Sequence, residues 1–107
     1  MKLLINKTTA FNSINVAENF FAKLFGLFIQ NPPLYIKNCN SIHTLFMKNN
    51  IDIIFLNKNN KVVKIYENVT PNKIIFPINE GKNIIELNAS FIKSAKIKIG
   101  DLVELEE

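Results

Sequence analysis

The sequence contains no arginine, a single cysteine and a single histidine. One cysteine rules out an internal disulfide framework and leaves the redox compartment open. No apolar run approaches the length of a membrane span, and the residues before Asn6 are too few for the hydrophobic region of a signal peptide. These absences lead us to expect a cytoplasmic protein with no membrane partner.

The absence of arginine also bears on the meaning of the positive charge. The formal net charge is +4, and all 13 basic residues are lysines spread along the chain. Arginine is the side chain that makes bidentate contacts to guanine and phosphate. We therefore interpret the lysines as a solvated surface and expect no nucleic-acid partner.

The chain is rich in apolar residues. Hydrophobic residues make up 48% of its 107 residues, with nine phenylalanines. A chain of this length can bury one core without disulfides or a structural metal, and this composition is not typical of disorder. We expect a single domain over residues 1–107.

A helical pattern stands near the N-terminus. Val16, Phe20 and further apolar residues recur at helical spacing, residues 12–15 offer N-caps and Gly26 offers a C-cap. This pattern predicts one N-terminal amphipathic helix from Val16 to Phe25.

Most of the remaining chain has the pattern of short strands. Ile51 to Leu56 is almost continuously apolar, which is typical of a central strand covered on both faces. The polar loop Asn57 to Asn60 joins it to a partner strand, and Ile42 to Lys48 fits either a strand or a helix. Such spacing favours a mainly β (α+β) fold, an antiparallel β-sandwich or barrel. The other expected strands are Met1 to Ile5 (as an edge strand), Leu34 to Asn38, Lys61 to Glu67, Lys73 to Ile78, Asn83 to Leu87, Lys96 to Ile99 and Leu102 to Glu106.

The stretch from Cys39 to Ile65 reads CNSIHTLFMKNNIDIIFLNKNNKVVKI. It resembles the bacterial and archaeal domain-of-unknown-function family 192, whose core reads roughly C-x-S-[IV]-H-T-x-x-M-x-x-x-I-D-[IV]-[IV]-F-L. The flanking Gly26-Leu27, the segment Ile84 to Leu87 and the segment Ile99 to Val103 are also similar to that family. The resemblance implies a mostly β fold of sandwich or jelly-roll type and no established activity.

Cys39, His43 and Met47 form the most conspicuous set of reactive side chains, because they are spaced four apart. Their atoms would suit copper or zinc. In a straight strand such neighbours lie about 13 Å apart, whereas in a helix they lie about 6 Å apart. The strand interpretation argues against one shared metal. We favour Cys39 and Met47 as buried packing residues, with His43 at the rim and no metal or cofactor.

Thiol or acid–base catalysis finds little support in the sequence. A Cys39–His43 nucleophile pair would need an oxyanion donor, and no glycine-rich turn lies beside Cys39. With one histidine, general acid–base chemistry would have to use His43 or a carboxylate such as Asp52 or Glu86. We favour a protein that is not an enzyme.

Asp52 stands out because it lies at the start of an apolar strand. A carboxylate there must be supplied with hydrogen-bond donors. We expect Asp52 to be at least partly buried and bonded to donors from the segment Ser41 to Asn50. For Glu86, both a structural role and a binding role are left open. Gly100-Asp101 predicts a turn before the last strand.

Two functional hypotheses follow. The first is a small non-enzymatic β domain, monomeric or weakly dimeric, that binds a small ligand or a protein partner through the surface from Cys39 to Asp52. The alternative is a soft-metal or thiol site centred on Cys39 and His43. The candidate binding residues are Cys39, Ser41, His43, Thr44, Met47, Asp52 and Glu86.

Overall fold

The computed structural model describes residues 1–18, 32–44 and 47–107, and strands dominate this part of the chain. The strands are β1 (Lys2–Ile5), β2 (Thr8–Phe11), β3 (Asn15–Ala17), β4 (Leu34–Ile36), β5 (Ile42–His43), β6 (Ile51–Leu56), β7 (Val62–Val69), β8 (Ile74–Ile75), β9 (Asn83–Asn88) and β10 (Val103–Glu106). One short helix, α2 (Phe91–Ala95), follows β9. No helix in these ranges is long and apolar enough to span a bilayer.

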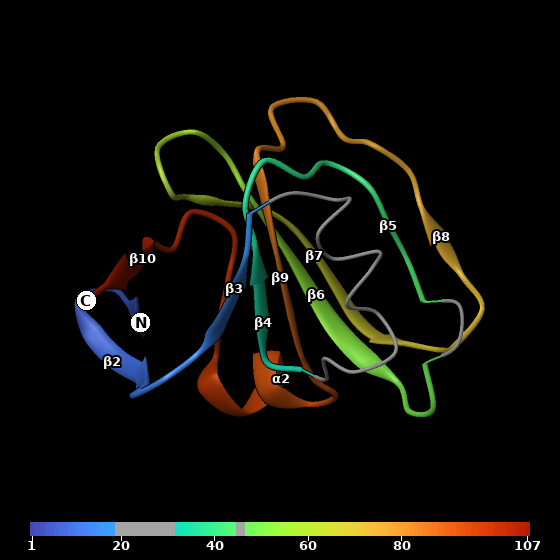
Figure 1. The fold of residues 1–107 in the computed structure, drawn as a ribbon, viewed down its shortest axis with the longest axis horizontal. Helices are drawn as coiled ribbons and strands as arrows, with labels where there is room; N and C mark the ends of the chain where they lie inside the picture. Colours follow the sequence, from blue (N-terminus) through green and yellow to red (C-terminus); the bar gives the residue numbers. More distant parts are fainter. Residues whose placement is uncertain (19–31, 45–46) are drawn as a thin grey trace.

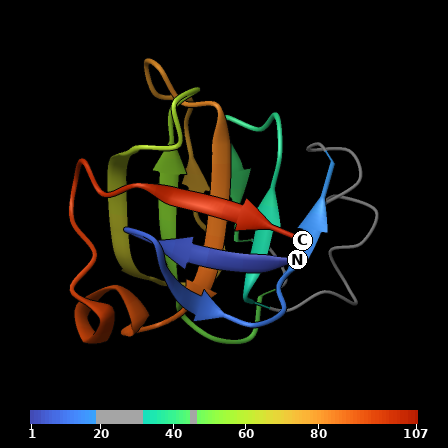
Figure 2. The same cartoon turned by 90° about the vertical axis from the view of Figure 1, so that its left-hand side faces the viewer.

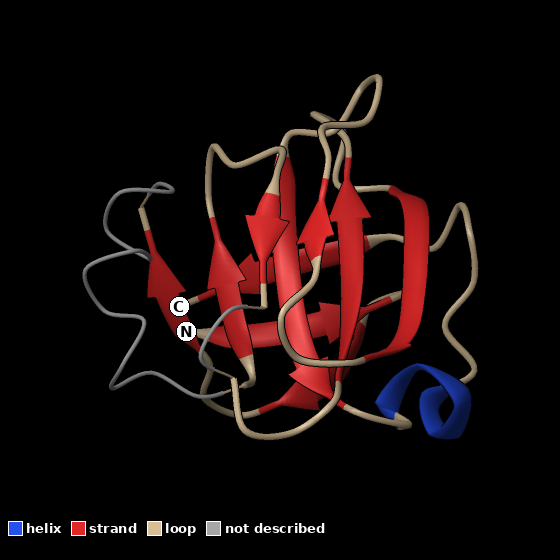
Figure 3. Cartoon of the chain, turned by 90° about the vertical axis from the view of Figure 1, so that its right-hand side faces the viewer, coloured by secondary structure: helices blue, strands red, loops and turns tan. Residues whose placement is uncertain are grey.

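The strands form three layers (Figure 1). The central sheet has five strands in the order β3-β4-β9-β6-β7. The terminal sheet has three strands in the order β10-β1-β2, and its strands run across those of the central sheet (Figure 2). The β5–β8 pair lies against the opposite face of the central sheet (Figure 3). The central sheet is therefore covered on both faces.

Strand β6 shows how the sequence produces this arrangement. All of its residues are buried, and side chains alternate between the two faces of a sheet. Ile54 and Leu56 pack in the terminal-side core, between the central and terminal sheets. Ile51 and Phe55 pack in the cleft-side core, on the face that the β5–β8 pair covers. The prediction of a strand buried on both faces is confirmed, and each such side chain stabilises the fold by roughly 1.5–3 kcal/mol.

The hairpin that follows β6 is also as predicted. Asn57 accepts hydrogen bonds at its side-chain oxygen from the backbone of Asn59 at 2.9 Å and of Lys61 at 3.0 Å. Asn60 takes a positive φ of 63°, which asparagine tolerates better than most residues. These local contacts close the loop and bring β7 back beside β6.

The expected helix from Val16 to Phe25 is wrong at its start. Val16 and Ala17 lie in β3, which pairs in parallel with β4, and residues 19–25 lie outside the described residues. Pairing with residues 34–36, far along the chain, overrides the local helical spacing. The described helix is instead α2, which the sequence pattern did not predict.

Lys96 to Ile99 is not a strand, although its residues alternate. Lys96 has a φ of 56° and donates its backbone N–H to carbonyls of α2, so it ends the helix. Ile97 turns into the terminal-side core, and Gly100, with a φ of 93°, makes the predicted turn before β10. A helix-ending loop therefore produced the same alternation that a strand would.

Three further expectations need correction. β1 is the middle strand of the terminal sheet rather than an edge strand, because β2 and β10 flank it. The strands do not close into a barrel: β3 and β7 end the central sheet at opposite edges. The parallel β3–β4 pair also makes the central sheet mixed rather than purely antiparallel. The layered, mainly β architecture is confirmed.

Candidate functional site

A shallow cleft of about 230 Å³ lies along the β5–β8 pair. Its lining is mostly apolar, with one hydroxyl and one imidazole among the side chains. The cleft is lined by Ser41, Ile42, His43, Ile74, Ile75, Phe76 and Pro77.

The pairing of β5 with β8 decides which side chains face outward. Ile42 lies opposite Ile75, and both are buried in the cleft-side core. His43 lies opposite Ile74 on the other face of the pair. Ile74 is therefore 60% exposed, and Phe76 just beyond the strand is 73% exposed. Two large apolar side chains are therefore exposed to solvent beside the cleft.

Thr44 holds one end of this surface in place. Its buried hydroxyl donates to the Thr70 carbonyl at 2.8 Å and accepts the backbone N–H of Lys73 at 2.8 Å. Its backbone carbonyl accepts the N–H of Asn72 at 3.0 Å. Thr44 therefore ties β5 to the segment that leads into β8.

Asn40 holds the other end. Its amide nitrogen donates to the carbonyl of Ile78 at 3.0 Å, and its amide oxygen accepts the N–H of Ile78 at 3.2 Å. A Cβ at Gly81 would collide with this Asn40 side chain. The glycine therefore permits the close approach that anchors the chain after Pro77.

Cys39 and Met47 lie beneath the surface. Cys39 is buried, and its thiol donates to the Ser41 carbonyl at 3.0 Å. Met47 is half-buried against the same cleft-side core. Among the residues that the structure describes, no three His, Cys, Asp or Glu side chains gather as a metal site would require.

Asp52 lies on the opposite face of the central sheet, with Ile54 and Leu56. Its side chain is 0% exposed and accepts the backbone N–H of Asn68 at 2.8 Å and of Ile92 at 3.0 Å. The predicted burial is confirmed, but the expected donors between Ser41 and Asn50 are wrong.

Two long-range features explain these donors. A bulge in β7 opposite Asp52 puts Asn68 at a φ of 55°, and Ile92 lies in the first turn of α2. Ser90, the N-cap residue, makes no side-chain bond to the helix. The carboxylate on β6 thus satisfies a helix N–H that its own cap leaves available.

Glu86 is buried in β9. It lies opposite Ile53 and Leu34, so its side chain is on the face that carries the cleft-side core. It does not line the cleft.

The candidate residues therefore scatter. Ser41 and His43 line the cleft, while Asp52 belongs to the other face of the central sheet. Cys39, Thr44 and Glu86 are buried.

Sequence reasoning missed Ile74, Phe76 and Pro77. The apolar run Ile74-Ile75-Phe76 predicted a strand, but a run without alternating polarity does not show which side chain faces outward.

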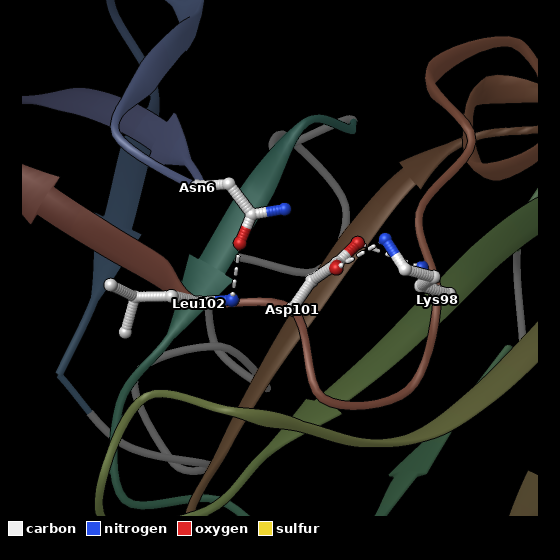
Figure 4. Close-up of polar contacts among 4 residues, drawn as sticks. All are labelled: Asn6, Lys98, Asp101 and Leu102. Atoms are coloured by element: carbon white, nitrogen blue, oxygen red, sulfur yellow. Dashed lines mark hydrogen bonds and ion pairs between the residues drawn. The ribbon is translucent and has the colours of Figure 1, made fainter.

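A second cleft, of about 310 Å³, lies between the β1–β2 turn and α2. Asp101 borders it and accepts the Lys98 backbone N–H at 2.9 Å and the Lys98 ammonium at 3.1 Å (Figure 4). Asn6 in the turn accepts the N–H of Leu102 at 3.0 Å. Asp101 and Asn6 together tie the loop after α2 to the turn after β1.

The pKa of Asp101 reflects competing effects. Burial by itself would raise the pKa of this carboxyl. Hydrogen bonds from the Lys98 backbone, the Asn6 side chain and the Lys98 ammonium, with the charge of that ammonium, outweigh burial and lower the pKa below its ordinary value. The interactions of the carboxylate are therefore internal and structural.

Comparison with known proteins places this fold among uncharacterised relatives. The model of domain-of-unknown-function family 192, described as "Uncharacterized ACR", matches residues 3–105. A UPF0127 protein of Pyrococcus abyssi is 30% identical over 115 residues, which cover 97% of each chain. A UPF0127 protein of Pyrococcus furiosus is 31% identical over 99 residues, which cover 85% of this chain and 84% of that protein.

Two solved structures share the fold. A protein of unknown function from Novosphingobium aromaticivorans superposes with a TM-score of 0.82 at 16% identity, covering 98% of this chain and 84% of that one. A protein from Sinorhizobium meliloti, described as a candidate transcription regulator, superposes with a TM-score of 0.77 at 18% identity, covering 96% and 89%. At these identities the likeness is one of fold alone.

Proposed function

Because this chain belongs to domain-of-unknown-function family 192, whose description names no activity, we propose a function from its surface. We propose that the protein is a non-enzymatic module that binds a partner protein through the β5–β8 cleft. The observation that carries this proposal is the exposure of Ile74 and Phe76 side by side at the cleft. Single exposed apolar residues are ordinary, whereas neighbouring ones at a hollow are typical of interaction sites.

The size of the cleft favours a protein side chain over a small ligand. Its volume of about 230 Å³ is below the roughly 300–1,000 Å³ typical of sites that enclose a drug-sized molecule. An apolar side chain of a partner would fit the hollow, and Ser41 and His43 would offer polar contacts at its rim.

The surface differs from the one expected from the sequence alone. Only Ser41 and His43 of the candidate residues line the cleft, and β8 supplies the rest of it from the other side. We do not propose the soft-metal or thiol alternative, because the Cys39 thiol is buried and donates to the Ser41 carbonyl. A cytoplasmic location and a monomer or weak homodimer remain part of the proposal.

A peptide selection tests the proposal. A phage-displayed library of random dodecapeptides would be selected on the purified full chain, and an enriched peptide would be synthesised and titrated calorimetrically. We expect Phe76→Ser and Ile74→Ser each to weaken binding about tenfold or more, equivalent to about 1.4 kcal/mol.

Ile99→Ser is the matched control. Ile99 is also an exposed isoleucine, at 59%, but it lies in the loop between α2 and β10 and does not line the cleft. We expect this variant to bind the peptide like the unaltered chain. If no peptide is enriched, or if all three variants bind equally, the proposal is wrong.

A further inference from the structure

We propose that the partner binds as an extended, acidic segment that adds a strand to the outer edge of β8. This inference rests on the proposed function, since it assumes that the β5–β8 cleft is a protein-binding site. It adds the mode of binding and the chemistry of the partner.

The register of the β5–β8 pair leaves backbone groups pointing outward. Thr44 donates its backbone N–H to the Lys73 carbonyl at 2.8 Å. In an antiparallel ladder, bonded and non-bonded pairs alternate, so the next pair, His43 and Ile74, is of the non-hydrogen-bonded kind. The N–H and carbonyl of Ile74 therefore point away from β5.

No other described strand pairs with this edge. β8 is hydrogen-bonded to β5 alone among the strands of residues 1–18, 32–44 and 47–107. Figure 1 shows β8 at the outside of the fold. Such an edge is a template for strand addition, in which backbone hydrogen bonds supply affinity and alternate side chains supply specificity.

The open edge is short and fixed at both ends. Pro77 has no N–H, and the N–H of Ile78 is taken by Asn40 at 3.2 Å. Thr44 holds the other end through Lys73. The edge therefore runs from Ile74 to Phe76, and little chain ordering would accompany binding there. Alternate side chains of an added strand would lie beside Ile74 and the cleft.

Charge indicates the kind of segment. The residues that line the cleft, Ser41 to His43 and Ile74 to Pro77, include no aspartate or glutamate, and Lys48 and Lys73 lie within five residues of them along the chain. Lys48 and Lys73 are exposed. Carboxylates beside the apolar anchors of a partner would complement this surface and speed its association. The apolar lining and the lack of arginine favour a protein segment over a nucleic acid.

Backbone methylation of the enriched peptide tests strand addition. In an added strand, alternate peptide N–H groups point toward β8 and the others point to solvent. We expect N-methylation of the peptide residues whose N–H groups point toward β8 to weaken binding about tenfold or more. We expect N-methylation of the residues in between to leave binding unchanged. Equal tolerance at both sets of residues would exclude strand addition.

A pair of protein variants tests the same edge from the other side. Ile74→Pro removes the outward N–H without touching a bond to β5, whereas Ile74→Thr alters the side chain and keeps the N–H. We expect Ile74→Pro to bind the peptide several-fold more weakly than Ile74→Thr at the same unfolding temperature. If they bind equally while Phe76→Ser still weakens binding, the added strand is wrong and the proposed function stands.

Charge and competing occupants are tested separately. We expect the enriched peptides to be acidic. We expect peptides whose carboxylate side chains are replaced by the corresponding amides to bind Lys73→Gln and the unaltered chain equally. A neutral or basic consensus would contradict the acidic partner. A single-stranded oligonucleotide that displaces the peptide would assign the edge to nucleic acid. A dimer seen by light scattering and lost in Ile74→Pro would assign it to a second copy. Either result would overturn the proposal.

Discussion

At the scale of single residues, Asp52 shows how a buried carboxylate is accommodated. Its neighbours in β6 are apolar, yet backbone N–H groups of Asn68 and Ile92 reach its two oxygens. These donors are 16 and 40 residues away in the sequence, so they come from different elements. Asp52 therefore links β6, the bulge in β7 and the start of α2.

Removing this carboxylate is expected to destabilise the fold. Asp52→Ala removes the acceptor of two backbone N–H groups, that of Ile92 in a buried bond and that of Asn68 in a part-buried one. A buried donor left without a partner costs on the order of 1–3 kcal/mol. We expect a total loss of about 3 kcal/mol in the free energy of unfolding, measured by urea denaturation. Asp52→Asn, which keeps one acceptor oxygen, serves as the control and is expected to lose less. Identical midpoints for Asp52→Ala and the unaltered chain would contradict the structural role.

Asp101 is expected to make the stability of the fold depend on pH in the acidic range. Its pKa is lowered in the fold, so its contribution is fully present above the ordinary carboxyl pKa of about 3.9 and is lost as pH falls toward the folded value. Asp101→Asn should therefore be less stable than the unaltered chain at neutral pH, and the gap should shrink below a pH of about 4. Denaturation midpoints across this range measure it. A gap that stays constant with pH would exclude the ionised carboxylate as its source.

At the scale of elements, the β5–β8 pair is too short to be stable by itself, because isolated two-stranded units are marginal in water. Its inward residues, Ile42 and Ile75, pack in the cleft-side core. Thr44 and Asn40 fix the two ends of the β8 segment by hydrogen bonds. The cleft is therefore held by the core beneath it and by side-chain contacts at its ends.

Thr44→Val tests that arrangement because valine keeps the shape and removes the hydroxyl. The Lys73 N–H and the Thr70 carbonyl would lose their partner, at a cost of roughly 1–3 kcal/mol. We expect faster hydrogen exchange of the Lys73 amide and a lower unfolding temperature. Thr9→Val, at an exposed position of β2, is the control and should change neither. Unchanged exchange at Lys73 would show that the hydroxyl does not hold β8.

At the scale of the whole molecule, the central sheet separates two cores. Tyr35 in β4 is buried in the terminal-side core, and its phenol bonds to the Asn83 side chain. Burial raises the pKa of Tyr35 to about 12, although the bond to Asn83 acts in the opposite direction. The neutral phenol is thus part of the folded state.

Alkaline pH is expected to destabilise the fold because the Tyr35 phenol loses its proton. The unfolded chain releases the Tyr35 proton near the ordinary pKa of about 10, whereas the fold retains it until about 12. Stability is therefore fully present below pH about 10 and falls between the two values. Urea midpoints should decline less steeply over this range in Tyr35→Phe. Parallel declines, or phenolate absorbance from Tyr35 well below pH 12 in the folded state, would contradict the assignment.

The sequence by itself determined the family, the mainly β fold and the hairpin in which Ile51 to Leu56 pairs with Lys61 to Glu67, a strand that the structure extends to Val69. It also determined that Asp52 would be buried and that Gly100 would turn the chain. The hairpin, the burial of Asp52 and the turn at Gly100 depend on neighbours within a few residues, namely a continuous apolar run, an asparagine loop or a residue that tolerates positive φ.

Only the tertiary structure decided that Val16 belongs to a strand and that Asp52 and His43 lie on opposite sides of the central sheet. It also decided that Ile74 and Phe76 border the cleft. Alternation along a strand defines two faces but not what covers each one. That depends on pairing between distant segments, because β5 meets β8 only after the chain has passed through β6 and β7.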